Sequence, residues 1–407
     1  MQTVSVLNNT KAIKHLTGTG IYLPSKQWTS IPYQLAVKYQ RDPGIVVDWL
    51  SLDNALDWEG SARHINLATP FDPHEGYGLM GNYILRALES KGIVTHISND
   101  VAWQRDESRR DVFLQNILNR NKTVTRWGIT HAWAPDFGDA CASHRIGWSM
   151  WESTRLPHKW ELFLELVERM IVPSKGQIQV FRNSGFKGPI DVIPDAVDFD
   201  AFTYLERPER DPFTFITWGR LSSRKCPMDL IECFMKAFPE DDVRLILKTR
   251  EHMLGGGQII PTIKDSRITV IDEEWSLSQV VDLCYKADAA VFLSHGEGFG
   301  QPAVQAMATG LPVILSNHSG QSDFCNEKYN YPVRTAGTVP GSMGTGHGDK
   351  LDWWESDYEH AMKRMREVYE NRAKAREKGR KASVYVRKQF SLDALAERLA
   401  KLVWSLE

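Results

Sequence analysis

The sequence predicts two doubly wound α/β domains in tandem, each built on a parallel sheet. From residue 65 onward, short apolar segments alternate with segments of helical periodicity, a pattern typical of parallel sheets covered on both faces. The alternation pauses at residues 194–212, which are rich in Asp, Glu, Arg and Pro. At 407 residues the chain is also longer than one hydrophobic core usually serves. We therefore expect a first domain over 1–200, a linker over 201–212, a second domain over 213–385 and a C-terminal helix over 386–407.

Six strands are expected in the first domain and five in the second. In the first domain they lie near residues 65–68, 94–97, 127–130, 145–150, 170–172 and 191–193. Residues 1–60 lack this pattern, and we expect an atypical, strand-bearing extension there. In the second domain we expect strands at 213–218, 243–248, 267–271, 289–293 and 313–315, and helices at 227–238 and 277–286. Beyond Asp352, a charged amphipathic pattern predicts long helices.

The composition excludes several classes of protein. A formal net charge of −2 gives no overall attraction to nucleic acid or anionic membranes. The five cysteines are scattered and form no Cys-x-x-Cys pair, which argues against a disulfide framework or a zinc site. Residues 1–20 lack the apolar region of a secretion signal, and no apolar stretch approaches the length of a membrane span. A cytoplasmic location is the expectation.

Residues 295–302, His-Gly-Glu-Gly-Phe-Gly-Gln-Pro, carry the strongest functional signal in the chain. The three glycines let the backbone approach a ligand, and Pro302 suits the first turn of a helix. The N–H groups and dipole at that helix start favour a bound anion. Glu297 precedes the anion site and would accept hydrogen bonds from hydroxyl groups. A nucleotide sugar offers both phosphate and hydroxyls.

Residues 219–225, Gly-Arg-Leu-Ser-Ser-Arg-Lys, follow the first strand of the second domain and precede a helix. Arg220, Arg224 and Lys225 therefore lie before a helix N-terminus, where each cation is disfavoured by up to about 1 kcal/mol. A bound anion would reverse that penalty. A solvated basic loop is the alternative interpretation.

Together, these two loops resemble the second domain of family 4 glycosyltransferases, which have the GT-B fold of two Rossmann-like domains facing a central cleft. Residues 219–225 match the family pattern Gly-Arg-Leu-x-x-x-Lys, and residues 297–302 match Glu-Gly-Phe-Gly-x-Pro. The resemblance implies that the first domain is the acceptor side and the second the donor side. It also implies that Arg220 and Lys225 hold the donor diphosphate and that Glu297 contacts the donor sugar.

One position departs from the family pattern. A second Glu, eight residues after the first, contacts the donor ribose in the family, and here that position is Gln305. Gln can form a hydrogen bond with a hydroxyl, but without the extra strength that a charged acceptor provides. The alternative interpretation is that Gln305 is an ordinary polar residue within a helix. The donor-binding residues that the resemblance implies are Gly76, Tyr77, Gly78, Gly219, Arg220, Lys225, Glu274, Gly298, Phe299, Gly300, Gln301 and Gln305.

The first domain supplies further candidates. Residues 71–78 resemble the glycine loop that lies against the diphosphate and acceptor in the family. His131 is the candidate for the family's first-domain histidine, with Trp133 as the alternative for that place. We expect catalytic roles for Glu297, Arg220, Lys225 and His131. Acceptor binding is expected for Asp72, His74 and Glu152.

Residues 76–81 also match Gly-x-Gly-x-x-Gly, with Asp100 about twenty residues on, as a dinucleotide-binding enzyme would require. However, residues 70–75 form a loop where such a site needs a tight turn. This disfavours an oxidoreductase.

The leading hypothesis is therefore a retaining transfer of sugar from a nucleoside diphosphate sugar to a hydroxyl acceptor, with no metal and no further cofactor. A non-catalytic sugar-nucleotide binder is one alternative. Another is transfer to a modified base in viral DNA, based on cations with interspersed Trp103 and Trp127 and on a basic tract over 372–388. These cations are Arg105, Arg109, Arg110, Arg120, Lys122 and Arg126.

Overall fold

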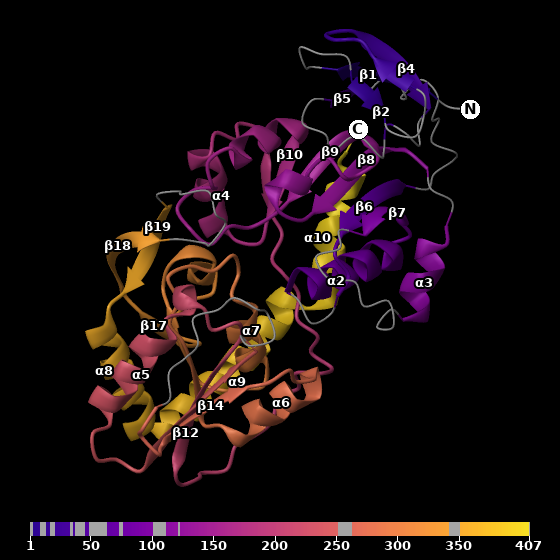
Figure 1. The fold of residues 1–407 in the computed structure, drawn as a ribbon. Helices are drawn as coiled ribbons and strands as arrows, with labels where there is room; N and C mark the ends of the chain where they lie inside the picture. The colour runs from indigo at the N-terminus through magenta and orange to yellow at the C-terminus, as the bar shows by residue number, and fades with distance from the viewer. Residues whose placement is uncertain are drawn as a thin grey trace.

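The computed structural model describes residues 3–8, 14–16, 21–32, 36, 45–48, 63–72, 76–100, 111–120, 123–250, 263–341 and 351–406. Two parallel sheets of six strands each form two lobes, drawn one above the other in Figure 1. The predicted fold class, two doubly wound α/β domains, is confirmed.

The first sheet has the strand order β11-β10-β9-β8-β6-β7, and every pair in it is parallel. All six expected strands are present as β6 (His64–Thr69), β7 (Val94–Asp100), β8 (Thr125–His131), β9 (Ala142–Trp148), β10 (Arg169–Val172) and β11 (Ile190–Val192). The helices of this domain are α2 (Gly76–Ser90), α3 (Val112–Leu118) and α4 (Lys175–Asn183).

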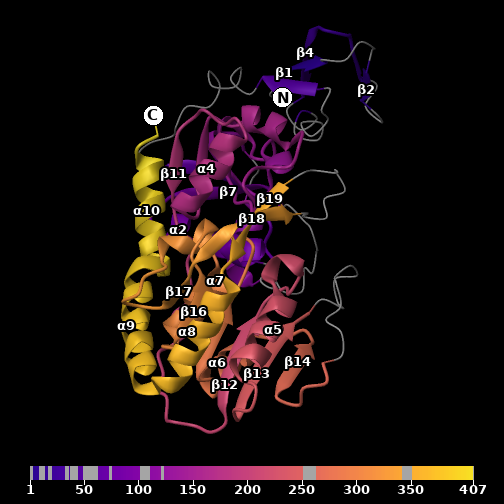
Figure 2. The same cartoon turned by 90° about the vertical axis from the view of Figure 1, so that its left-hand side faces the viewer.

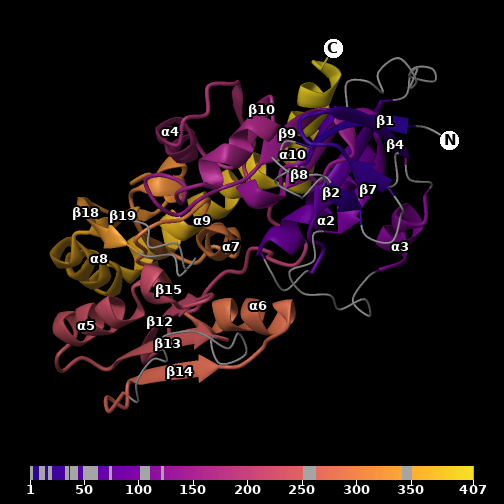
Figure 3. The ribbon, with the colours of Figure 1, turned by 45° about the horizontal axis from the view of Figure 1, so that its top comes forward.

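The N-terminal extension carries strands, as expected. β1 (Thr3–Asn8) pairs antiparallel with β4 (Trp28–Pro32) and β5 (Ile45–Asp48), and β2 (Lys14–Leu16) pairs with β3 (Ile21–Leu23). Its apolar side chains pack with Val124, just before β8. Figures 1 and 3 place this small sheet on the side of the first domain that faces away from the second domain.

The second sheet has the order β14-β13-β12-β15-β16-β17. Its strands are β12 (Phe213–Trp218), β13 (Val243–Thr249), β14 (Ile268–Asp272), β15 (Ala289–Phe292), β16 (Val313–Ser316) and β17 (Tyr331–Val333). Its helices are α5 (Pro227–Ala237), α6 (Leu277–Lys286), α7 (Gln301–Ala308) and α8 (Tyr358–Glu370).

The long helices expected beyond Asp352 are confirmed, although they do not begin directly after that residue. A hairpin of β18 (Thr335–Gly341) and β19 (Leu351–Ser356) comes first, and the helix begins only at Tyr358. Asp357 sets that start, because its carboxylate accepts a hydrogen bond from the His360 N–H at 2.9 Å.

The last two helices tie the domains together. α9 (Arg372–Phe390) packs against α7 of the second domain, whereas α10 (Leu392–Trp404) packs against α2 of the first. Leu395, Leu399 and Val403 belong to the core that also holds the buried residues of α2. Figure 2 shows the two helices following one another along the side of both lobes. The end of the chain thus completes the core of the first domain.

The glycines at residues 76–81 lie in the first turns of α2, where the sequence predicted a loop against the ligand. A Cβ on Gly78 would lie 1.9 Å from the Asp72 carbonyl oxygen, and one on Gly81 would lie 2.3 Å from that of Pro70. These glycines therefore let α2 pack tightly on the chain that follows β6.

This packing predicts opposite outcomes for two alanine substitutions two residues apart. Gly78→Ala is expected to lower the free energy of unfolding by about 1–3 kcal/mol, because backbone must move to admit the methyl group. Gly76→Ala is the matched control, since a Cβ there meets nothing within 4 Å and alanine favours helix. Urea unfolding of both variants measures the difference, and equal stabilities would contradict the packing argument.

Candidate functional site

Each sheet has a switch point, where the order of strands reverses direction. β6 lies between β7 and β8, and β12 lies between β13 and β15. Open α/β sheets bind ligands outside the carboxyl ends of the strands at such points. The candidate site is therefore built from the residues that end or follow β6, β8, β12 and β15.

At the second switch point, a buried ionic cluster joins the two predicted loops. The Lys225 ammonium contacts a carboxylate oxygen of Glu297, which is only 6 % exposed. The Arg224 guanidinium lies 3.5 Å from the other Glu297 oxygen and 3.7 Å from a carboxylate oxygen of Glu152. Glu152 comes from the first domain, so the cluster spans the junction between the domains.

The pKa values of Glu297 and Lys225 depend on their burial and on the charges of their neighbours. Burial alone would raise the pKa of Glu297, but Lys225 and Arg224 together hold it below its usual value. Burial lowers the pKa of Lys225, and Glu297 partly opposes that shift. Glu297 therefore carries its charge at neutral pH, facing two cations of its own domain.

At the first switch point, His131 lies at the end of β8 beside the end of β6. It is fully buried, and its Nδ1 lies 2.9 Å from Thr69 Oγ1. Within the part of the chain that the structure describes, its Nε2 has no hydrogen-bond partner. Burial lowers the pKa of His131 to about 3, so the imidazole is neutral. Tyr77 packs on this ring with a centroid separation of 4.8 Å.

The remaining predicted donor residues lie in different surroundings. Gly300, with φ of +98°, precedes α7, and the Gln301 amide donates a hydrogen bond to the Ala196 carbonyl at 3.2 Å. Gln305 is buried in α7, whereas Phe299 packs in the core of the second domain. Arg220, after Gly219, and Glu274, after β14, are exposed.

The junction between the domains is tightly packed around the Glu297 loop. The Gln177 side-chain amide donates to the Glu297 carbonyl at 3.3 Å, and the Ser174 hydroxyl donates to the Gly298 carbonyl at 3.2 Å. A Cβ on Gly296 would lie 2.4 Å from the Glu152 carbonyl oxygen, and one on Gly298 would meet the Met150 side chain. Glycine at these positions lets the loop approach the first domain closely.

Of the predicted acceptor residues, Glu152 is the one that the structure brings to the cluster. Asp72 is partly buried ahead of α2, and His74 lies outside the described residues. Arg105, Arg109, Arg110, Lys122 and Trp103 of the proposed nucleic-acid surface also lie outside them.

Sequence reasoning missed two buried groups near this junction. Asp195 follows β11, its Oδ1 has no hydrogen-bond partner in the described structure, and burial raises its pKa to about 7. His318 follows β16 and stacks on Trp354, and burial lowers its pKa to about 4. Each residue lies shortly after the end of a strand. Both would have been found by inspecting the residues that follow every strand, because ligands bind at the carboxyl ends of the strands in such sheets.

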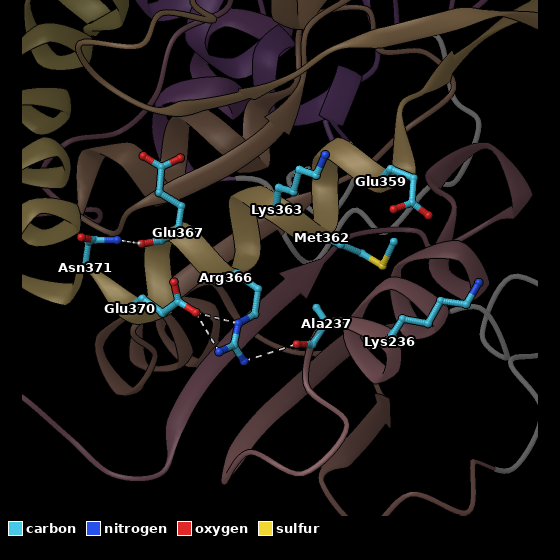
Figure 4. A pocket seen from close by; sticks show the side chains of 9 residues that line it. All are labelled: Lys236, Ala237, Glu359, Met362, Lys363, Arg366, Glu367, Glu370 and Asn371. Carbon is cyan, nitrogen blue, oxygen red and sulfur yellow. Dashed lines mark hydrogen bonds and ion pairs between the residues drawn. The ribbon is translucent and has the colours of Figure 1, made fainter.

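A hollow of about 590 Å³ lies elsewhere, between α5 and α8 (Figure 4). Its lining is mostly charged, and Arg366 there is engaged with Glu370 and with the Ala237 carbonyl. The hollow shares no residue with the ionic cluster, so it is separate from the candidate site.

Known proteins that resemble the chain in sequence are glycosyltransferases. Residues 262–399 match a family model described as "Family 4 Glycosyltransferase in conflict systems". Over these residues the chain is similar to family 4 glycosyltransferases. It is 30% identical over 154 residues to GDP-mannose:cellobiosyl-diphosphopolyprenol alpha-mannosyltransferase of Xanthomonas campestris, covering 37% of this chain and 40% of that protein. It is 26% identical over 205 residues to D-inositol 3-phosphate glycosyltransferase of Mycolicibacterium smegmatis, covering 46% and 43%.

Solved structures share the fold over a longer range. Sucrose-phosphate synthase from Thermosynechococcus elongatus has a TM-score of 0.60 at 15% identity, with 84% of this chain and 98% of that one covered. Anabaena Alr3699/HepE in complex with UDP-glucose has a TM-score of 0.60 at 13% identity, with 84% and 100% covered. The fold is therefore GT-B, whereas the chain spans less than half the length of the two curated relatives. None of the described helices is both long and apolar enough to cross a membrane.

Proposed function

We propose that this protein transfers a glycosyl group from a nucleoside diphosphate sugar to a hydroxyl acceptor, with retention at the anomeric carbon. The observation that supports this most is the buried cluster of Lys225, Arg224 and Glu297 at the switch point of the second sheet, next to the start of α7. It combines cations for a diphosphate with a carboxylate for sugar hydroxyls. The match of residues 262–399 to a glycosyltransferase family supports the same assignment.

In the proposed reaction, the bond from C1 of the sugar to the diphosphate oxygen breaks, and negative charge grows on the leaving phosphate. Lys225, Arg220 and the N–H groups at the start of α7 would stabilise that charge by fixed electrostatics. The acceptor oxygen bonds to C1, and its proton leaves with the diphosphate. We propose that these cations take the place of a metal ion at the diphosphate.

Glu297 and His131 have complementary parts in this proposal. The charged carboxylate accepts hydrogen bonds from donor-sugar hydroxyls, and the neutral imidazole offers its unpartnered Nε2 to another hydroxyl from the first domain. A donor has to displace some of the contacts that Lys225 now makes with Glu297. Donor binding is therefore coupled to rearrangement of this ion pair.

Two experiments test the proposal. Thermal shift with a panel of nucleotide sugars identifies the donor, because a bound ligand raises the melting temperature. Release of nucleoside diphosphate in the presence of candidate acceptors then distinguishes an enzyme from a non-catalytic binder. A donor that stabilises the protein but is never consumed would favour the binder.

The Gln305 position supplies a further prediction. Gln305→Glu is expected to tighten binding of the matching nucleoside diphosphate by about tenfold, because a carboxylate bonds ribose hydroxyls more strongly than an amide does. Calorimetric titration measures the dissociation constant. Unchanged affinity would mean that Gln305 does not contact the ribose.

Several described cations of the two basic stretches are engaged within the protein, which weakens the case for transfer to a DNA base. Arg120 is paired with Glu89 at 2.6 Å, Arg372 with Asp211 at 2.9 Å, and Lys378 donates to the Asn330 carbonyl. These groups are engaged within the protein, which favours an ordinary helix surface over a nucleic-acid surface.

A further inference from the structure

Three side chains with metal-binding atoms meet beside the ionic cluster. The Cys226 Sγ, a carboxylate oxygen of Asp229 and a ring nitrogen of His295 all lie within 4.8 Å of one another. Cys226 directly follows Lys225, and His295 stands two residues before Glu297. Asp229 lies in the first turn of α5. The group therefore connects the two loops that carry the proposed donor contacts.

One ring nitrogen of the histidine is held by a backbone carbonyl. Its Nδ1 lies 2.8 Å from the Trp354 carbonyl oxygen, which can only accept, so Nδ1 carries the proton. In the neutral imidazole, Nε2 therefore keeps a lone pair that can bind a metal. A metal-binding histidine usually donates a hydrogen bond from its other ring nitrogen to a partner such as a backbone carbonyl. Stacking on Trp353 at a centroid separation of 5.3 Å fixes the plane of the ring.

The cysteine has an unusual backbone. Cys226 is buried and has φ of +49° and ψ of 44°, a left-handed conformation that is strained for a residue with a side chain. A glycine would remove that strain but also the thiol. In this conformation the Cys226 Sγ lies close to the Asp229 carboxylate and the His295 ring.

We propose that Cys226, Asp229 and His295 bind a Zn²⁺ ion that fastens the Lys225 loop to the Glu297 loop. Sulfur, imidazole nitrogen and carboxylate oxygen together suit Zn²⁺, whereas Mg²⁺ and Ca²⁺ prefer oxygen alone. On binding, the thiol releases its proton to solvent, and the thiolate and carboxylate together balance the two positive charges. The side chains must draw closer, to bonds of about 2.3 Å for sulfur and about 2.0–2.2 Å for nitrogen and oxygen.

This site differs from a metal at the diphosphate and does not depend on the proposed transferase activity. Its effect would be to reinforce two loops that already meet through the backbone, where the His295 N–H donates a hydrogen bond to the Arg224 carbonyl at 2.7 Å. No zinc-site spacing is visible in the sequence, because His295 comes from a part of the chain far from the other two ligands. Folding alone brings them together.

Titration of chelator-treated protein with Zn²⁺ alone tests the proposal. One Zn²⁺ is expected to bind per chain, and Cys226→Ser and Asp229→Asn are each expected to weaken binding by at least about 100-fold, more than loss of a supporting residue costs. The matched controls, Cys233→Ser and Glu232→Gln on the same helix, are expected to bind as the unaltered protein does. With Co²⁺ in place of Zn²⁺, sulfur-to-metal charge-transfer absorption should appear and should vanish in Cys226→Ser.

Two results would overturn the site: no stoichiometric Zn²⁺ binding by the unaltered protein, or equal binding by Asp229→Asn and Glu232→Gln. Asp229 is partly exposed, so Asp229→Asn is expected to fold. This variant tests the zinc site even if Cys226→Ser fails to fold.

Discussion

Lys225→Met is expected to reduce donor-dependent transfer by about 100- to 1,000-fold, the usual cost of removing one group that stabilises charge in a transition state. Methionine keeps most of the length of the side chain but places no charge beside the leaving phosphate. Initial rates of nucleoside diphosphate release, at saturating donor, measure the loss. The exposed Lys236, which pairs with Glu232 on α5, supplies the control, because Lys236→Met should leave the rate unchanged.

The same substitution should also destabilise the fold, and a second variant separates the two effects. Removing one partner of a buried ion pair typically costs about 3–5 kcal/mol, and the nearby Arg224 should reduce that cost here. The double variant Lys225→Met with Glu297→Gln removes both charges, so it should regain stability without regaining activity. A folded Lys225→Met protein with a full rate would rule out the proposed role.

Asp195→Asn is expected to stabilise the protein at neutral and alkaline pH. Burial raises the pKa of Asp195 to about 7, whereas an unfolded aspartate titrates near 3.9. Between these values the folded state binds more protons than the unfolded state, so stability falls as pH rises from about 4 to about 7. Above pH 7 the whole cost is present, on the order of 4 kcal/mol for a shift of about three units.

The asparagine variant should lose this part of the pH dependence, because its side chain does not ionise. Urea unfolding at pH 5 and pH 8 measures the effect: the stability difference between the two proteins should be smaller at the lower pH than at the higher. Asp200→Asn, an exposed change in the same segment, serves as the control. Parallel stability curves for the unaltered protein and Asp195→Asn would contradict the assignment.

The sequence predicted the two sheets apart from β17, because most of their strands are buried and stand out as apolar runs, whereas β17 is an edge strand of only three residues. β18 was missed because it is largely exposed and contains Gly337 and Pro340. Its sequence therefore lacks the apolar residues that mark a buried strand. Its partner β19 was hidden for a different reason: its Asp and Glu residues continue the charged pattern of the helices that follow.

The loops at the candidate site were predictable from their place after strands, whereas their contacts were not. Glycines and cations after β12 and β15 indicate an anion site wherever the chain folds this way. The approach of Glu152 to Arg224 depends on how the two domains meet, which no local pattern encodes. The same holds for Asp195, whose Oδ1 has no hydrogen-bond partner among the described residues and whose burial is a property of the assembled junction.

The chain passes between the domains twice, and the two passages touch each other. The Val197 N–H donates to the Phe390 carbonyl at 2.9 Å, and the Arg387 guanidinium donates to the Phe199 carbonyl at 3.2 Å. Bending at the Phe390–Leu392 break between α9 and α10 must therefore accompany bending near Val197. Separation of the lobes would then be a swing about this shared pivot, and it would have to break the close approach of the Gly296 backbone to Glu152.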